Sequence, residues 1–427
     1  MTKQTQHIPT GYKLSPLGPI PEDWEVKKLG DLCENKGDYG LNAPATDYSV
    51  NLPTYLRITD IDDNGNFIHS AKKSVDNLSA KEYYLKDGDI VFARTGATVG
   101  KTYLYDVRDG QLVYAGFLIK FSPNPNKLIP YYLKAHTETK DYTNWVAITS
   151  QRSGQPGINA AEYCSLKLAI PPIEEQERIC NVLQLWDTAI SKQAQLVEKL
   201  TLRKRGLMQK LLTGKKRLKG FSGEWKEVRL GEIGIAYGGL VNKNKEDFEN
   251  GNALFITYMN VFSNGKIDIN NLGQVRILPS EKQEQVQYGD IFFTVSSETP
   301  DEVGMASVLL NEVQNTYLNS FCFGYRLNDF KFIVPVYASY LFRGDDFRKE
   351  MFKIAQGSTR FNISKTEVLS MRITIPSIEE QNAIASVLVE ADKEIELANK
   401  KLERLQEEKK GLMQVLLTGE KRITNKI

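Results

Sequence analysis

The segment Ile170-Pro-Pro-Ile-Glu-Glu-Gln176 recurs 205 residues further along the chain as Ile375-Pro-Ser-Ile-Glu-Glu-Gln381. From these starting points, residues 170–214 and residues 375–419 are identical at 22 of 45 positions. Agreement of this extent at one fixed shift indicates an internal duplication, which bears on the whole architecture. The sequence therefore predicts one structural unit that is used twice, with short additional segments at the ends.

Each repeated stretch carries a seven-residue pattern of apolar positions. Steps of four and three residues alternate over about five heptads, which is the spacing of a coiled-coil helix. One lysine in each copy, Lys204 or Lys409, interrupts the pattern. The predicted seam residues are Ile179, Leu183, Trp186, Ile190, Val197, Leu200, Leu207 and Leu211 in the first copy, and Ile384, Leu388, Ala391, Ile395, Leu402, Leu405, Leu412 and Leu416 in the second.

The ends of both helices are marked in the sequence. Pro172 and Ser377 are residue types found where helices begin, and Gly214 and Gly419 stand where left-handed C-caps are expected. Each helix should then contain about 38 residues and span ~57 Å.

Two kinds of partner fit such helices. A homodimeric coiled coil would pair helices from two chains, whereas the duplication favours antiparallel pairing of the two helices of one chain about a pseudo-two-fold axis. Full overlap of the two seams places Trp186 near Lys409. The remaining parts of the chain would then lie at opposite ends of a rod of fixed length.

The segments between the repeated stretches are rich in short β-forming runs and in turn-forming Gly-Asp and Asn-Gly pairs. We therefore predict an α+β fold in which two strand-rich domains are each followed by a long helix, and the two helices pair as an intramolecular antiparallel coiled coil. The predicted boundaries are 1–170 for the first domain, 171–214 for the first helix, 215–375 for the second domain and 376–427 for the second helix with its tail.

The composition is that of a globular chain and excludes several other classes of protein. Of 427 residues, 41% are hydrophobic and 25% are charged, and a formal net charge of +2 by itself indicates no nucleic-acid or membrane partner. The four cysteines are scattered and there are three histidines, so we expect reduced thiols and no metal site. Because no apolar run approaches ~20 residues and the first residues lack a signal-like apolar core, we expect a cytoplasmic protein.

Motifs for catalysis are incomplete or missing. Residues 94–102, Arg-Thr-Gly-Ala-Thr-Val-Gly-Lys-Thr, resemble a phosphate-binding loop, but only three residues separate Gly96 from Gly100 and a strand is expected to follow. The Ile-Pro-Pro-Ile sequence at 170–173 lacks the polar first residue and aromatic last residue of an amino-methyltransferase site. We therefore expect no catalytic residues in this chain.

Three motifs occur in the same order in both halves of the chain: a Trp…Leu-Gly start, an Ile-Pro-x-Ile-Glu-Glu-Gln helix entrance and a Gly-Leu-Met-Gln-x-Leu-Leu-Thr-Gly helix end. This double set resembles the DNA-specificity subunit of type I restriction–modification systems. The resemblance covers about residues 20–420. It implies that the two variable domains are target recognition domains, each recognising one half of an asymmetric bipartite site in double-stranded DNA, and that the helices set the spacing.

The same resemblance implies the partners and the cofactors. Two methyltransferase (modification) subunits that use S-adenosylmethionine would dock on the helices, and restriction/translocase subunits that use ATP and Mg²⁺ would join them. No cofactor is expected in this chain.

DNA contacts require hydrogen-bond donors on loops of the variable domains. In the first domain the candidates are Arg94, Thr95, Lys101, Gln151, Arg152, Ser153 and Gln155. In the second domain they are Ser296, Ser297, Ser358, Thr359, Arg360 and Asn362. The same residue types also occur in ordinary solvated turns, so this alternative stays open for each of them.

Two other functions are consistent with parts of the sequence. A coiled-coil scaffold could carry two protein- or glycan-binding domains, and it would need no DNA-binding loops. A self-sufficient methyltransferase or nuclease is disfavoured, because the motifs for either chemistry are missing.

Overall fold

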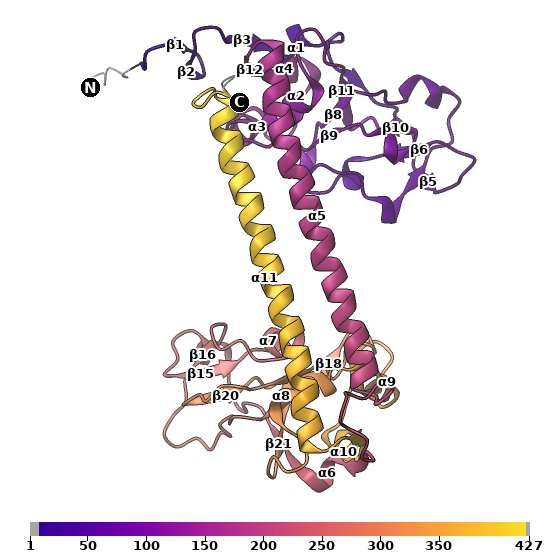
Figure 1. Ribbon diagram of the computed structural model, residues 1–427, viewed down its shortest axis with the longest axis vertical. Helices are drawn as coiled ribbons and strands as arrows, with labels where there is room; N and C mark the ends of the chain where they lie inside the picture. The colour runs from indigo at the N-terminus through magenta and orange to yellow at the C-terminus, as the bar shows by residue number, and fades with distance from the viewer. Residues whose placement is uncertain (1–7, 424–427) are drawn as a thin grey trace. The chain divides into compact units, whose positions relative to one another are not determined.

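The computed structural model describes residues 8–423 and divides into two compact units (Figure 1). Unit 1 comprises residues 1–193 and 401–427, and unit 2 comprises residues 194–400. The division passes through both long helices, so each unit contains one strand-rich domain together with parts of both helices. The first seven residues and the end of the predicted C-terminal tail, 424–427, lie outside the described residues.

The strand-rich part of unit 1 contains two four-stranded sheets. Their strands are β4 (Asp38–Tyr39), β5 (Thr46–Asp47), β6 (Thr54–Leu56), β7 (Lys73–Ser74), β8 (Ile90–Ala93), β9 (Thr102–Leu104), β10 (Leu112–Tyr114) and β11 (Leu118–Phe121). The order β4-β11-β8-β9 is antiparallel throughout, whereas β10-β6-β7-β5 includes one parallel pair, β10 with β6. Phe92, Phe121 and Tyr163 are fully buried against the first sheet and form the centre of the core.

Two smaller sheets and five helices complete this part of the chain. The small sheets are the hairpin of β1 (Tyr12–Ser15) and β2 (Gly18–Pro21), and the pair of β3 (Glu25–Lys28) and β12 (Lys167–Ile170). The helices are α1 (Leu29–Leu32), α2 (Pro130–His136), α3 (Lys140–Thr149), α4 (Ala160–Cys164) and the long α5 (Ile173–Leu211).

Unit 2 repeats this plan. Its strands are β13 (Lys226–Arg229), β14 (Gly234–Gly238), β15 (Ala253–Ile256), β16 (Gly273–Val275), β17 (Ile291–Thr294), β18 (Ser296–Ser297), β19 (Ala306–Val308), β20 (Thr316–Leu318), β21 (Cys322–Leu327), β22 (Phe361–Asn362) and β23 (Arg372–Ile375). An antiparallel sheet, β14-β21-β17-β19, matches the first sheet of unit 1. The sheet β16-β15-β20 again contains one parallel pair. The helices are α6 (Leu230–Ile233), α7 (Tyr258–Ser263), α8 (Pro335–Leu341), α9 (Asp345–Lys353), α10 (Lys365–Ser370) and the long α11 (Ile378–Leu417).

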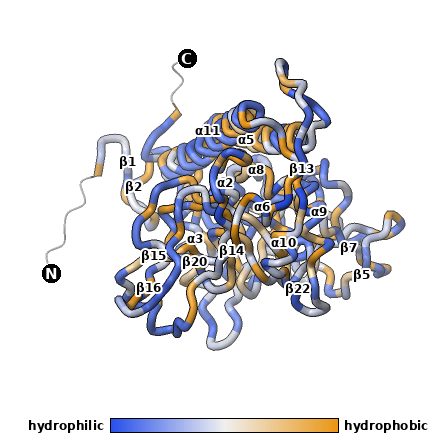
Figure 2. Tube along the Cα trace, turned by 90° about the horizontal axis from the view of Figure 1, so that it is seen from below, coloured by the Kyte–Doolittle hydropathy of each residue, from blue (hydrophilic) through white to orange (hydrophobic). Residues whose placement is uncertain are grey.

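The long helices pair antiparallel within each unit. In unit 1, Ile179 and Leu183 near the start of α5 share a buried cluster with Leu416 near the end of α11. In unit 2, Leu211 at the end of α5 shares a cluster with Leu388 near the start of α11. All sixteen predicted seam residues are buried or half-buried, and both helices carry hydrophobic as well as hydrophilic residues (Figure 2). The predicted fold class is confirmed.

The lysines that interrupt the apolar pattern form ion pairs with the opposite helix. Lys409 lies 2.6 Å from Asp187, the residue after Trp186, and also contacts Glu138 at 3.2 Å. Lys204 lies 2.5 Å from Asp392 in the corresponding place of unit 2. Since 187 and 392 differ by the repeat shift of 205, the same antiparallel register is present in both units.

The repeated helix entrance joins each helix to its strand-rich domain through a glutamine. The buried Gln176 side chain accepts a hydrogen bond from the Ile129 N–H (2.9 Å) and donates to the Lys127 (3.1 Å) and Pro171 (3.0 Å) carbonyls. Gln381 makes the same three contacts with the Val334 N–H and the Phe332 and Pro376 carbonyls. The side chain thus holds the segment that leads into α2 or α8.

The glutamate before each glutamine binds an arginine from the tail that follows the other long helix. Arg422 contacts the buried Glu175 at 2.6 Å, and Glu175 also accepts a hydrogen bond from Trp24. Arg217 contacts Glu380 at 2.6 Å, and this ion pair raises the pKa of its guanidinium. Gly214 and Gly419 have positive φ, 69° and 76°, which confirms the predicted left-handed helix ends.

Within residues 8–423, none of the helices is long and apolar enough to cross a membrane.

Replacing Gln381 with alanine should lower the free energy of unfolding by about 2–4 kcal/mol, because three buried backbone groups lose their partner at once. Urea unfolding followed by tryptophan fluorescence measures the effect. Glu379→Ala, two residues earlier in the same helix entrance, is the matched control and should change stability little. Equal effects of the two substitutions would contradict the role given to Gln381.

His136 makes the stability of unit 1 depend on pH. Its Nε2 atom is buried with no partner within the described residues, and burial lowers the pKa of the ring to about 4. The unfolded chain takes up this proton near pH 6.5, so stability is lost as the pH falls from about 6.5 towards 4. In His136→Phe, the loss between about pH 7 and about pH 5 should be smaller by about 2 kcal/mol than in the unsubstituted chain. Parallel pH profiles of urea unfolding would disprove this.

Candidate nucleic-acid interface

At one end of the antiparallel sheet of unit 1, three loops are joined by backbone hydrogen bonds. The Phe117 carbonyl accepts from the Arg94 N–H (3.0 Å), and the Arg94 carbonyl accepts from the Ile158 N–H (2.9 Å). These bonds connect the turn before β11, the segment after β8 and the loop between α3 and α4. We call the three together, residues 115–118, 94–98 and 151–158, the loop edge of unit 1.

Unit 2 builds the same arrangement on the same bonds. The Phe321 carbonyl accepts from the Val295 N–H (3.0 Å), and the Val295 carbonyl accepts from the Ile363 N–H (3.1 Å). The loop edge of unit 2 consists of residues 319–322, 295–299 and 356–363. The backbone of this site is therefore repeated, although the loop sequences differ.

A glycine packs against the turn in each loop edge. A Cβ on Gly40 would lie 2.3 Å from the Ala115 carbonyl oxygen, and one on Gly239 would lie 2.0 Å from the Asn319 oxygen. Both distances are below any tolerated contact with backbone atoms. The close approach leaves the backbone of the turn little room to move.

The structure brings most predicted contact residues of the first domain together in this loop edge. The Arg94 guanidinium lies over the Tyr39 ring, 4.9 Å from its centroid, and Thr95 bridges to Gly157. Gln151, Arg152, Ser153 and Gln155 are all exposed on the third loop.

Two of the predicted cations in the first domain already have carboxylate partners. Arg152 donates to Glu162 at 2.5 and 2.6 Å. Lys101 contacts Asp63 at 2.6 Å, and this contact lowers the pKa of the Asp63 carboxyl. Asp63 is almost fully exposed, so its bond to Lys101 is open to competition from another anion such as a phosphate.

The predicted residues of the second domain also meet in a loop edge. Ser296 and Asn362 face each other in the short antiparallel pair of β18 and β22. Ser358, Thr359 and Arg360 are exposed on the same loop. Ser297 differs from the others, because it is buried and its hydroxyl donates to Glu302 at 3.4 Å.

Two half-buried arginines bind backbone carbonyls of unit 2. Arg348 donates to the carbonyls of Asp301, Val303 and Gly304, each at 2.7 Å, and so holds the chain that returns from Ser296. Arg343 donates to four carbonyls around residues 261–264 and at 306, and burial lowers its pKa to about 10. The Arg348 bonds hold the chain that follows the loop segment 295–299, whereas the Arg343 bonds join the end of α7 to the start of β19.

Sequence reasoning left one pair of residues out of the site. The side chains of Phe117 and Phe321 are 57% and 66% exposed at the tips of the equivalent turns. The signal for them was the shared phenylalanine in two otherwise divergent interiors, 204 residues apart. Tyr39, which contacts Arg94, was missed as well, because the second half of the chain has no tyrosine at the equivalent position to draw attention to it.

A family model described as the type I restriction modification DNA specificity domain matches residues 21–201 and again residues 222–407. The chain belongs to this family. The two matches follow the duplication, so the resemblance found in the sequence is confirmed: the chain is a type I specificity subunit with two DNA specificity domains.

Individual relatives agree with the family model over nearly the full length. Two proteins of Methanocaldococcus jannaschii that carry the names of the MjaX and MjaVIII type I specificity subunits are 28% and 26% identical, over 96% and 95% of this chain and 97% and 95% of theirs. One similar chain comes from a structure determined to study complex assembly and conformational transition of a type I restriction–modification system. It superposes with a TM-score of 0.60 at 17% identity, over 94% of this chain and 99% of that one. The S subunit from M. genitalium gives a TM-score of 0.52 at 15% identity, over 94% and 97%.

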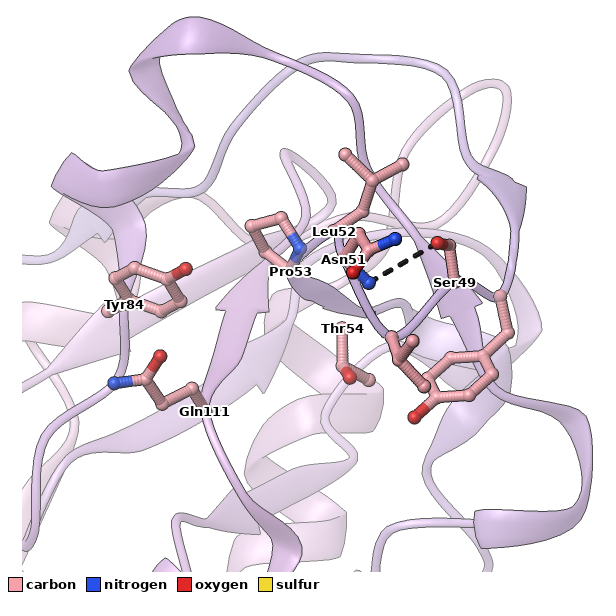
Figure 3. A pocket seen from close by; sticks show the side chains of 9 residues that line it. Ser49, Asn51, Leu52, Pro53, Thr54, Tyr84 and Gln111 are labelled. Carbon is pink, nitrogen blue, oxygen red and sulfur yellow. Dashed lines mark hydrogen bonds between the residues drawn. The ribbon is translucent and has the colours of Figure 1, made fainter.

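Between residues 8 and 423, no three His, Cys, Asp or Glu side chains are placed to hold a metal ion. Burial raises the pKa of the Cys33, Cys180 and Cys322 thiols to about 12, which keeps them protonated and unreactive. A cavity of about 420 Å³ lies between segment 48–54 and the side chains of Tyr84 and Gln111 (Figure 3), and its lining includes no carboxylate, imidazole, thiol or amine.

In this specificity subunit, Gly40→Ala should displace the turn of the first loop edge and lower the free energy of unfolding by about 2 kcal/mol or more, because the new methyl group meets backbone oxygens. Thermal or urea unfolding of the purified chain measures this change. Gly154→Ala is the matched control, since that exposed glycine of the same loop edge has open space around it. A well-tolerated Gly40→Ala would mean that the turn is free to move.

Proposed function

We propose that this chain is the non-catalytic DNA-recognition subunit of a type I restriction–modification complex, and that each loop edge contacts one half of an asymmetric bipartite site. The proposal rests on one observation: the two loop edges share the same backbone hydrogen bonds but present different side chains. The same hydrogen-bond series presents Arg94 and a glutamine-rich loop in unit 1, but Ser296 and Arg360 in unit 2. Two equivalent scaffolds with different donors suit two different DNA sequences.

The chemistry of the loops supports contact with duplex DNA. Arginine and glutamine present paired donors or acceptors to base edges in the major groove, and arginine also binds phosphates. The loop tips are exposed, while their bases are held by backbone bonds and, in unit 2, by Arg348. Loops of this kind lose little conformational entropy on binding.

The helices are proposed to set the spacing of the half-sites and to dock two methyltransferase (modification) subunits. The buried antiparallel seam supports a fixed helix pair. Leu185, Leu202 and Leu397 are 70%, 59% and 67% exposed, and they offer apolar contacts to a partner protein. In this proposal S-adenosylmethionine, ATP and Mg²⁺ bind to the modification and restriction/translocase subunits, and the complex acts on DNA in the cytoplasm.

Exchanging residues 30–165 for the corresponding domain of another specificity subunit should change one half of the methylated site only. Methylation mapping on DNA modified by the reconstituted complex measures this, with the unexchanged chain as the control. A change in both half-sites, or in neither, would contradict the assignment of one half-site to each domain. Failure to bind DNA with the modification subunits present would favour a coiled-coil scaffold instead.

A further inference from the structure

We propose that Phe117 and Phe321 make direct apolar contacts with bases, each within the half-site of its own unit. The inference rests on the proposed function and deepens it, because it names the residues that would make the apolar contacts with DNA, which hydrogen-bond donors cannot make. A phenyl ring carries no donor or acceptor, so in a DNA groove its favourable contacts are the thymine methyl group and the face of a partly unstacked base.

Both rings are exposed at the tips of their turns. The residue after the phenylalanine is buried in each turn, Leu118 in unit 1 and Cys322 in unit 2, and Ala115 at the start of the first turn is buried as well. In unit 1 the phenylalanine is the one exposed residue of the turn, and in unit 2 it is exposed together with Ser320. A single exposed apolar side chain is ordinary on a protein surface, so an external contact is inferred from the repetition of this one at the same place in both units.

The repetition is visible in the sequences of the two turns. The two turns are Ala115-Gly-Phe-Leu118 and Asn319-Ser-Phe-Cys322, and the phenylalanine is the one residue they share. In both units its carbonyl begins the hydrogen-bond series through the three loops. The ring is therefore kept at the same place while the surrounding donors change, as expected for a contact that both half-sites need.

The turns are built to hold the ring still. Gly40 and Gly239 allow the backbone of the preceding segment to lie directly against the turn. A further backbone bond closes each turn, from Leu118 to Ala115 (2.8 Å) and from Cys322 to Asn319 (3.1 Å). An aromatic side chain on such a support loses little freedom when it binds, which favours its use as an anchor among adaptable polar contacts.

The position of the rings favours DNA over a protein partner. Phe117 lies next to Arg94, and Phe321 lies next to Val295 and the segment that leads to Ser296, so both belong to the loop edges. The apolar residues available for a protein partner on the long helices, such as Leu185 and Leu397, belong to other elements.

The test uses the complex of the full chain with its modification subunits and measures its affinity for a DNA duplex that contains the mapped site, at several salt concentrations. Phe117→Ala and Phe321→Ala should each weaken binding about tenfold and reduce discrimination against changes in one half-site only. The slope of log affinity against log salt should stay the same, because no phosphate contact is lost. Phe117→Leu, which keeps an apolar side chain, should retain part of the affinity.

Matched controls lie beyond the opposite end of each sheet. Val107, 63% exposed, follows β9, and Phe332, 46% exposed, follows β21, whereas Phe321 precedes that strand. Val107→Ala and Phe332→Ala should leave both affinity and discrimination unchanged.

Three results would overturn the proposal. Unchanged affinity and discrimination in both phenylalanine variants would show that neither ring contacts a base. The proposed function would still stand if domain exchange changed one half-site. A uniform loss on all sequences with a smaller salt slope would indicate phosphate-contacting neighbours instead. Loss of the modification subunits from the purified complex would make the rings a protein-docking surface. An unsubstituted complex without sequence preference would instead contradict the proposed function itself.

Discussion

The architecture depends on one polar contact that occurs once in each unit, the glutamine at the entrance of the long helix. Gln176 and Gln381 each join three backbone groups from two segments, in a place where water is excluded. A long amphipathic helix by itself has no preferred angle to a neighbouring sheet domain. The three directed bonds provide that angle, and the neighbouring Glu175–Arg422 and Glu380–Arg217 pairs close the junction from the side of the other helix.

In the seam of the helix pair, apolar residues and charged residues have different effects. The leucines and isoleucines supply burial along most of its length, but they would tolerate a slip of one heptad with modest loss. The ion pairs Lys409–Asp187 and Lys204–Asp392 would be broken by such a slip. Apolar contacts therefore stabilise the pairing, whereas the two charged positions specify its register.

Much of this fold was predictable from the sequence because it follows from periodicity. The 3.5-residue spacing predicted the helices and their buried face, the glycines Gly214 and Gly419 predicted the helix ends, and the shift of 205 predicted the antiparallel pairing. The loop edges were harder. Residues near 94 and 151–155 were placed in one site because of their residue types, but the bonds that join them bridge segments far apart in sequence and leave no local pattern. Burial of Ser297 beside a half-buried Ser296 depends on the direction of a two-residue strand, and such a strand carries no periodicity.

The position of Arg422 has a consequence for how the molecule is made. Unit 2 is formed by one continuous stretch, 194–400, whereas unit 1 needs residues 1–193 together with 401–427. Tyr12 donates a hydrogen bond to the Gly419 carbonyl at 2.7 Å, and Arg422 contacts Asp23 as well as Glu175. On the ribosome, the part of unit 1 that is synthesised first must therefore wait with part of its apolar surface uncovered until residues 401–427 emerge. Unit 2, residues 194–400, is complete before residues 401–427 have been synthesised.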